Sequence, residues 1–358
     1  MTKQFFMQKA TNRRKELVNG WYMSEKLDGM RVFWDGGLTR GVPKADVPFA
    51  NHDKDSRYRV QPICTGLWTQ LGNIIHAPDW FLDQLPEGFM LGGELWESYG
   101  FRQEMMSIVK KLEPVDSEWE GIKIYAYEAP VASQVFKDRD IDIRNCKMRI
   151  RYDEVAAFAE SRGTLWQELS LNPCSFGREI QRLHEVCNNC DVITVHEQIK
   201  LPYSPEGVAE RISEMFDLVI SRGGEGIIFR NPQEFWETCR SKNIVKMKQV
   251  DDAEGTVIGY ITGRETDKGS KLLGKMGALV LRLDNGRTMK LSGFTDEERE
   301  LMSSEATAWA TTNPETKCPD WITNPMFPRG TRVTFKYRGL TKDGIPEEPR
   351  YWRKRLDD

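Results

Sequence analysis

The stretch Ser24-Glu25-Lys26-Leu27-Asp28-Gly29-Met30-Arg31 sets a lysine two residues before an Asp-Gly pair and five before an arginine, and a strand-like run, Val32-Phe33-Trp34, follows it. An ordinary lysine, with a pKa of ~10.4, is a poor nucleophile at neutral pH. A lysine that does covalent chemistry must be partly buried or lie beside other cations. Taken alone, the pattern is better explained by an exposed strand end with a turn at Asp28-Gly29. Lys26 becomes a candidate nucleophile only if other segments supply suitable neighbours.

Two later segments supply such neighbours. In Asn243-Ile244-Val245-Lys246-Met247-Lys248, apolar and basic residues alternate, so a strand would turn both lysines to one face, with Ile244 beside them. Gly223-Gly224 reads as a turn that feeds a buried strand, with Glu225 at its mouth and suited to a magnesium ion. A lysine nucleophile, a carboxylate and paired lysines together indicate attack on a nucleotide phosphate.

The ordered motifs resemble those of the covalent nucleotidyltransferases, and within them most closely a compact ATP-dependent DNA ligase of the phage and bacterial type. The motifs are KxDGxR (Lys26 to Arg31), Gly93-Glu94, Tyr127-Glu128, EGIIFR (Glu225 to Arg230) and KMK (Lys246 to Lys248). Residues 252–259, 276–279 and 292–295 are similar to the oligonucleotide-binding (OB) barrel of small ligases. The resemblance covers nearly the whole chain.

The resemblance implies an α+β fold in two domains. Residues 1–249 would form an ATP-grasp-like adenylation, or nucleotidyltransferase, domain of antiparallel sheets and helices, and residues 250–358 a small closed all-β OB barrel. Ser204-Pro205 predicts a capped amphipathic helix that ends at Gly223-Gly224. In the second segment, Asp284-Asn285-Gly286 and Lys342-Asp343-Gly344 are typical of turns between short strands.

The resemblance also implies a three-step reaction that uses ATP and Mg²⁺, with Mn²⁺ as an alternative metal. Lys26 attacks the α-phosphate of ATP and holds AMP as a phosphoramidate. The adenylate then passes to a 5′-phosphate at a nick in double-stranded DNA, and the 3′-hydroxyl finally displaces AMP. Such chemistry depends mainly on positioning and charge neutralisation, so the other site residues are expected to act as clamps.

The expected roles follow residue by residue from the resemblance. The nucleotide-binding set is Glu25, Lys26, Arg31, Glu94, Tyr127, Lys246 and Lys248. Glu225 and Glu94 would serve the metal, Glu94 alternatively a ribose hydroxyl, and Tyr127 would stack on adenine unless it is a core aromatic. Arg40 and Arg31 would hold the 5′-phosphate. Arg353 and Arg355 would orient the pyrophosphate.

The chain departs from the family pattern in two places. Gly92 stands where the family usually has an acidic residue, before Gly93-Glu94, which removes that carboxylate from the expected site. The last motif resembles Arg353-Lys354-Arg355-Leu356-Asp357-Asp358 but lacks its final lysine. Because Arg353 and Arg355 still carry charge, adenylation is expected to survive.

Charge and composition limit how the chain could bind nucleic acid. Over 358 residues the formal charge is -3, so binding must use local basic patches rather than bulk charge. From Arg329 to Arg355, cations outnumber carboxylates and four aromatic residues are interleaved among them. This segment suits phosphate and sugar contacts, and the alternative is an exposed strand face with its tyrosines packed inward.

The cysteines indicate a reducing compartment, because seven scattered cysteines do not form a disulfide framework. His184, Cys187, Cys190 and His196 have spacings reminiscent of zinc sites, but a helix over residues 175–189 with core cysteines explains them without metal. The N-terminus lacks an apolar signal segment and no run is long enough to span a bilayer. We expect a monomer without a membrane partner, in the cytoplasm, or in the host cytoplasm if the chain is viral.

Two stretches look longer than a minimal ligase needs, residues 42–71 and 134–201. Each is either a loop that reaches around DNA or surface decoration.

Three other functions remain possible from the residues alone. An RNA ligase or an mRNA capping guanylyltransferase would share the motifs, whereas an NAD-dependent ligase is disfavoured because no four-cysteine module follows. A non-catalytic nucleic-acid-binding protein is a rival of another class. It would not need a lysine beside other cations.

Overall fold

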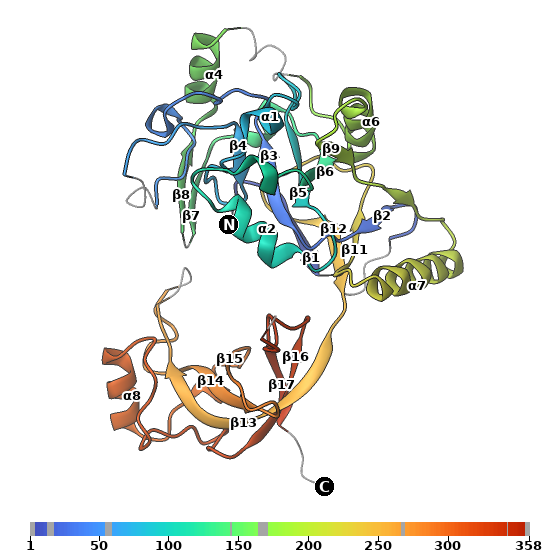
Figure 1. Cartoon of the computed structure of the whole chain (residues 1–358). Helices are drawn as coiled ribbons and strands as arrows, with labels where there is room; N and C mark the ends of the chain where they lie inside the picture. The colour runs from blue at the N-terminus through green and yellow to red at the C-terminus, as the bar shows by residue number, and fades with distance from the viewer. Residues whose placement is uncertain are drawn as a thin grey trace. The chain divides into compact units, whose positions relative to one another are not determined.

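The computed structural model describes residues 4–12, 18–53, 59–143, 145–163, 171–265, 269–341 and 343–354. The chain divides into two compact units, Met1–Met247 and Lys248–Asp358 (Figure 1). The sequence places the boundary after Gln249.

The first unit contains two five-stranded sheets and a hairpin. One sheet has the order β1 (Lys9–Asn12), β12 (Arg240–Lys248), β11 (Gly226–Arg230), β2 (Tyr22–Glu25), β10 (Ile199–Lys200). The other has the order β4 (Leu67–Thr69), β3 (Met30–Trp34), β5 (Leu91–Trp96), β6 (Lys123–Glu128), β9 (Ile193–Val195). The expectation of antiparallel sheets is only partly right, since β1 with β12 and β6 with β9 pair in parallel. Parallel neighbouring strands need a crossover connection. The helix before β9 lies in the connection from β6 to β9.

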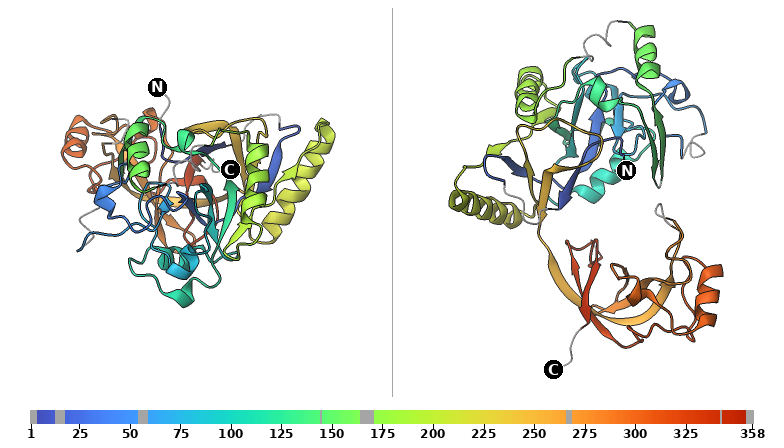
Figure 2. Two further views of the ribbon diagram at one scale, coloured as in Figure 1. Left: turned by 90° about the horizontal axis from the view of Figure 1, so that it is seen from above. Right: turned by 180° about the vertical axis from the view of Figure 1, so that it is seen from behind.

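The helices in the described part of the first unit lie around its strands (Figure 2). They are α1 (Asp79–Leu82), α2 (Arg102–Val109), α3 (Ala132–Val135), α4 (Tyr152–Ser161), α6 (Phe176–Cys187) and α7 (Pro205–Ser221), with 3₁₀ turns η1 (Lys44–Asp46) and η3 (Asp116–Glu118). The predicted helix after Ser204 is confirmed: the Ser204 hydroxyl accepts from the backbone N–H of Gly207, and Pro205 is the first helical residue. Because α7 ends just before Gly223, it delivers Glu225 to the start of β11.

Described residues of both long stretches form part of the core, which neither sequence-based alternative anticipated. Phe49 and Trp68 of the first stretch share one hydrophobic cluster with Ile141 and Met148 of the second. Met148 lies on the hairpin of β7 (Arg139–Ile143) and β8 (Cys146–Ile150). The buried Asn51 side chain joins the two stretches, because its amide donates to the carbonyl of Asn145 at 2.8 Å. β4, β9 and β10 also come from these stretches, so they form parts of both sheets.

The second unit is an open sheet with a helix, which corrects the expected closed all-β barrel. Its strands are β15 (Thr288–Leu291), β14 (Met276–Leu283), β13 (Asp251–Thr262), β16 (Arg332–Tyr337) and β17 (Arg350–Lys354), in that order. In the described residues, the edge strands approach at the single bridge between Ser292 and Arg350 rather than along a ladder. The 3₁₀ turn η4 (Glu297–Arg299) and helix α8 (Ser304–Thr312) lie between β15 and β16. The predicted turn at Asp284-Asn285-Gly286 is confirmed between β14 and β15.

All seven cysteines are free thiols. Cys187 is buried on α6, and Cys190 Sγ donates to the carbonyl of Gln84 at 3.0 Å. No helix in the described parts of the chain combines the length and the apolar character needed to cross a membrane.

Candidate active site

Strand pairing fixes Lys26 beside Glu225. β2 and β11 are antiparallel with Glu25 opposite Ile227, and the backbone N–H of Lys26 donates to the carbonyl of Gly226 at 2.8 Å. The residue before Gly226 therefore faces the lysine, and Lys26 Nζ forms an ion pair with the Glu225 carboxylate. Both side chains are only about one-fifth exposed, at 21% and 23%. The structure thus gives the candidate nucleophile a partly buried site.

Gly29 allows the loop after Lys26 to lie against β5. A Cβ at this position would lie 2.1 Å from the carbonyl oxygen of Leu95, closer than any side chain tolerates. The Asp-Gly pair of the motif is thus explained by a close backbone approach as well as by a turn. Asp28 forms an ion pair with Arg102 at 3.1 Å, which ties the same loop to α2.

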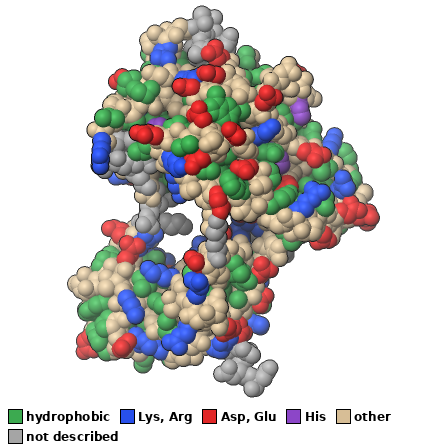
Figure 3. Space-filling view, in the orientation of Figure 1, with side chains coloured by type: hydrophobic (Ala, Val, Ile, Leu, Met, Phe, Trp, Pro, Cys, Tyr) green, Lys and Arg blue, Asp and Glu red, His purple; other side chains and the backbone are tan. Residues whose placement is uncertain are grey.

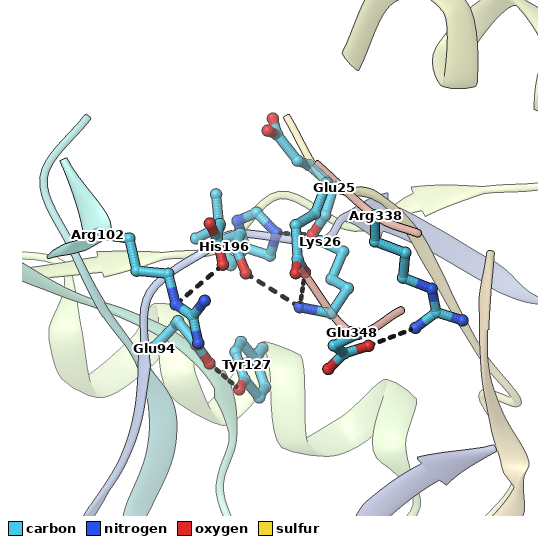
Figure 4. Close-up of polar contacts among 11 residues, drawn as sticks. Glu25, Lys26, Glu94, Arg102, Tyr127, His196, Arg338 and Glu348 are labelled. Atoms are coloured by element: carbon cyan, nitrogen blue, oxygen red, sulfur yellow. Dashed lines mark hydrogen bonds and ion pairs between the residues drawn. The ribbon is translucent and has the colours of Figure 1, made fainter. Parts of the chain in front are cut away.

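Three site side chains come from neighbouring strands of one sheet. Arg31 on β3 lies directly opposite Glu94 on β5. Between β5 and β6 the register shifts: Gly92 pairs with Glu128 and Gly93 with Ala126, so Tyr127 is the extra residue of a β-bulge. Bulges redirect side chains beside functional sites. Tyr127 lines the site and its hydroxyl donates to Glu94 Oε2 at 3.1 Å (Figure 4).

These side chains line a cavity of about 320 Å³ in the first unit. Its charged and polar lining comes from both sheets and their connections: Lys9, Ser24, Glu25, Lys26, Arg31, Gln70, Glu94, Tyr127, His196, Arg230, Arg240 and Lys246. Six of these are Lys or Arg and two are carboxylates, so the cavity favours an anionic ligand. A cavity of this volume is of the size that small-molecule ligands occupy.

Burial governs the electrostatics of the cavity. Burial raises the pKa of the Glu94 carboxyl, although Lys26 and Arg31 oppose the rise. Burial also raises the pKa of Glu25, whose Oε2 accepts from the Tyr99 hydroxyl at 3.0 Å. The pKa of His196 is lowered by burial, so its imidazole is neutral near pH 7. Because its Nε2 lies 2.8 Å from the carbonyl oxygen of Glu25, that nitrogen carries the proton.

The two lysines of the KMK motif have different surroundings. Lys246 lines the cavity together with Ile244, which confirms that these alternate residues share a face of β12. Lys248 is the first residue of the second unit. Its contact with the α-phosphate stays a prediction.

Arg40 lies outside this cavity. It lines a second cavity of about 440 Å³, and its Nη2 is 2.6 Å from Asp83 Oδ1 and 3.3 Å from Asp79 Oδ1. A 5′-phosphate would have to compete with these two carboxylates for the guanidinium. The predicted role of Arg40 is therefore not explained by the cavity around Lys26.

The basic strands near the C-terminus divide into structural and exposed cations. Arg332 pairs with Glu254 and Asp284, and Arg329 donates to backbone carbonyls of residues 319–322. Lys336 Nζ and Arg353 lie 4.3 and 4.4 Å from the ring centre of the exposed Trp352. Arg355, the other predicted pyrophosphate ligand, lies outside the described residues.

Sequence reasoning missed five residues of the cavity: Lys9, Gln70, His196, Arg230 and Arg240. Lys9 and Arg240 are cross-strand partners in the parallel β1 and β12 pair, a pairing that no local pattern predicts. Arg230 was visible as the last residue of EGIIFR, and that position was its only signal. His196 and Gln70 lie in the two stretches interpreted as additions.

The two units have the fold of ligase nucleotidyltransferase domains that carry an OB-type domain. Residues 269–355 match the family model for the DNA ligase OB-like domain. The chain is 25% identical to a DNA ligase of Haemophilus influenzae over 338 residues, which is 94% of this chain and 88% of that one. It is also similar to a solved structure from a structure-function study of Lig E DNA ligases that bind DNA with a minimal scaffold, with a TM-score of 0.63, 25% identity and 98% of each chain covered. The structure Pmar-Lig_PreS3 shares the fold at a TM-score of 0.60 and 15% identity, over 98% of this chain and 68% of that one.

Over nearly its whole length, the chain is therefore similar to compact DNA ligases.

Proposed function

We propose that this chain is an ATP-dependent DNA ligase, which seals nicks in duplex DNA through a covalent Lys26-AMP intermediate. The observation that carries the proposal is the position of Lys26, partly buried at a cation-lined cavity of about 320 Å³ beside Glu225. Lys26 Nζ, once deprotonated, forms a bond to the α-phosphorus of ATP while the bond to the leaving pyrophosphate breaks. Transfer to a 5′-phosphate and attack by the 3′-hydroxyl complete the sequence.

The side chains around the cavity have distinct proposed roles in nucleotide binding. Tyr127 stacks on adenine, which its position on the cavity wall supports over a role in the core. Glu94 accepts from a ribose hydroxyl, and Glu25 helps to shape the wall between Lys26 and His196. Lys246 contacts the α-phosphate from β12, and Lys248 is proposed to join it. These roles place hydrogen bonding at the sugar and positive charge at the phosphates.

Magnesium fits the donor set at this site, and manganese is the proposed substitute. No group of three or more His, Cys, Asp or Glu in the described residues could hold a metal by itself. Mg²⁺ commonly binds through one or two carboxylates together with substrate phosphates and water, which Glu225 and Glu94 could provide. When bound, the ion would neutralise charge that develops on the phosphates. Glu225, which is paired with Lys26 in this structure, would be one of the residues that hold the ion.

The remaining cations are proposed to bind phosphates of the nick and of pyrophosphate. Arg31 faces the cavity and suits the nucleotide or the 5′-phosphate, while Arg40 is proposed for the 5′-phosphate strand. Arg353 and Arg355 are proposed to orient pyrophosphate. Lys9 and Arg240 add two adjacent charges at the cavity, a further support for a phosphate-rich substrate.

We propose that the enzyme acts as a monomer on nicked double-stranded DNA in the cytoplasm. The free thiols and the absence of a membrane-crossing helix in the described residues are compatible with that location.

The test is sealing of an end-labelled, singly nicked duplex with Mg²⁺, with ATP, NAD or no nucleotide. Lys26→Ala is compared with Lys110→Ala, which removes an exposed lysine at the end of α2. The expected result is ATP-dependent sealing by the parent and Lys110→Ala and none by Lys26→Ala. Sealing confined to RNA strands, or labelling by GTP alone, would instead favour the RNA ligase or the capping enzyme, and unchanged activity of Lys26→Ala would favour a binding protein.

A further inference from the structure

A fully buried carboxylate, Glu128, lies behind the nucleotide cavity and connects its two sheets. Its side chain is 0% exposed. It forms ion pairs with Arg31 from β3 and with Arg230 from β11, the latter at 2.8 Å between Nη2 and Oε1. The Trp236 indole donates to Oε2 at 3.0 Å. Because β3 and β11 belong to different sheets, Glu128 holds together two arginines that no backbone pairing joins.

Both arginines also face the cavity and contact Tyr127. Their guanidinium carbons lie 5.3 Å (Arg31) and 4.8 Å (Arg230) from the ring centre of Tyr127. Two buried cations this close would repel each other without an anion between them. The carboxylate supplies that anion: although burial opposes ionisation, Arg31 and Arg230 lower the pKa of Glu128 below its usual value.

Gly92 leaves the space that this carboxylate occupies. It is the cross-strand partner of Glu128, and a Cβ at position 92 would lie 2.9 Å from Glu128 Oε2. The same site that lacks a carboxylate at position 92 therefore holds one from the neighbouring strand.

We propose that Glu128 is a positioning residue for the ligation reaction: it holds Arg31 and Arg230 against Tyr127 and so sets the wall on which the nucleotide binds. The inference rests on the proposed function, since it concerns the binding of ATP before Lys26 reacts. Glu128 itself touches no reacting atom and acts through the two arginines.

The experiment measures covalent labelling of the full-length chain over a range of ATP concentrations. Glu128→Gln removes the charge with little change of shape, and Glu179→Gln is the matched control. Glu179 is equally buried, on α6, and accepts from the backbone N–H of Ala129 at 3.3 Å. We expect the KM for ATP to rise about tenfold or more in Glu128→Gln, with a smaller change in kcat, and to stay within about twofold in Glu179→Gln.

Two further variants separate positioning from loss of folding. Thermal melting reports the folded fraction, and should Glu128→Gln not fold, Glu128→Asp keeps the charge but shortens its reach, with an intermediate rise in KM expected. The Glu128→Gln/Arg230→Lys double variant tests whether Glu128 acts through Arg230. If it does, adding Glu128→Gln to Arg230→Lys should raise the KM for ATP by a smaller factor than adding Glu128→Gln to the parent. An unchanged KM in the folded Glu128 variant, or fully multiplicative effects in the double variant, would overturn the proposal.

Labelling and DNA sealing by the parent protein distinguish a failure of this inference from a failure of the proposed function. Labelling by a nucleotide without sealing of DNA would contradict the proposed function, and the Glu128 comparison would then be made with the nucleotide that labels the chain. Absence of any labelling would overturn both.

Discussion

The charged side chains of the first unit's cavity and those of β16 and β17 in the second unit follow opposite rules. Around Lys26 the charges are buried or partly buried and are held by partners of opposite sign, such as Glu225 for Lys26 and Glu128 for Arg230. On β16 and β17, Lys336 and Arg353 are exposed and rest on the indole of Trp352. Buried pairs are fixed before a ligand arrives, whereas exposed cations exchange freely with ions and water.

The contrast separates recognition of one small ligand from contact with a long polyanion. A preorganised cavity gives specificity because each group already has its position. Exposed cations give affinity that depends on salt and little on sequence. On the visible face of the first unit, acidic and basic side chains are interspersed rather than gathered by sign (Figure 3).

The largest expected difference between the two regions comes from charge-conserving substitution. Lys26→Arg keeps the charge but removes the nucleophile, so labelling by ATP should fall at least about a thousandfold. Lys336→Arg makes the same exchange on β16 and should change labelling by less than about twofold. The measurement is the initial rate of covalent labelling at saturating ATP, and a labelled Lys26→Arg protein would remove Lys26 from its role.

Buried and exposed carboxylates should give opposite pH dependence of stability. Burial raises the pKa of Asp35 to about 6, although the Thr39 hydroxyl and the Trp68 indole donate to it. A raised folded-state pKa means that folding takes up a proton, so stability present below pH ~3.8 is lost as pH rises through ~6, by on the order of 3 kcal/mol. In the second unit, Lys271 lowers the pKa of the exposed Asp296. The stability that this carboxylate contributes to the folded protein is therefore lost as pH falls.

Asn substitutions test this sign. The unfolding free energy of Asp35→Asn minus that of the parent, from urea titrations, should rise between pH 4 and 6. The same difference for Asp296→Asn should rise as the pH falls below the pKa that the Asp296 carboxyl has in the unfolded chain. Equal slopes for the two variants would contradict the assignment.

Two strand glycines offer a smaller and more local comparison. A Cβ at Gly92 meets Glu128, whereas a Cβ at Gly259 in β13 has no heavy atom within 4 Å. Gly92→Ala should therefore displace the carboxylate and raise the KM for ATP by about fivefold, and Gly259→Ala should change it by less than about twofold. The initial rate of covalent labelling over a range of ATP concentrations measures both, and equal effects would show that the conflict at position 92 is relieved elsewhere.

The smallest expected effect concerns the exposed cations. Lys336→Ala and Arg353→Ala should each weaken binding to a nicked duplex by about three- to fivefold and reduce the salt slope by about one. Lys290→Ala, an exposed lysine on β15, is the control. Binding measured over a series of salt concentrations decides the matter, and unchanged slopes would assign Lys336 and Arg353 to the fold alone.

Local motifs predicted the parts of the site whose conformation depends on residues close by in the sequence. The alternation around Lys246 and the turn before Glu225 are short-range patterns, and both placed their residues correctly in strand and turn. Lys9 and Arg240 could not be found this way, because their meeting depends on pairing between the first and twelfth strands. The bulge that turns Tyr127 into the cavity likewise depends on register with β5.

The fold class could be predicted from the sequence, but not whether the sheet of the second unit closes into a barrel. Short strands and turns indicated a small barrel, and the family resemblance implied the OB type. Whether the edge strands close into a barrel depends on long-range geometry. The stretches at residues 42–71 and 134–201 looked peripheral because neither alone carries a long apolar pattern. Their hydrophobic residues become a core only when the two segments meet around Asn51.

The shared space of Gly92 and Glu128 has an evolutionary consequence. Because a Cβ at position 92 conflicts with the carboxylate at position 128, residue 92 can become larger only if residue 128 shortens or moves. Homologous chains with a larger residue at the first position are therefore expected to carry a shorter one at the second, so the pair should covary while each strand keeps its pattern.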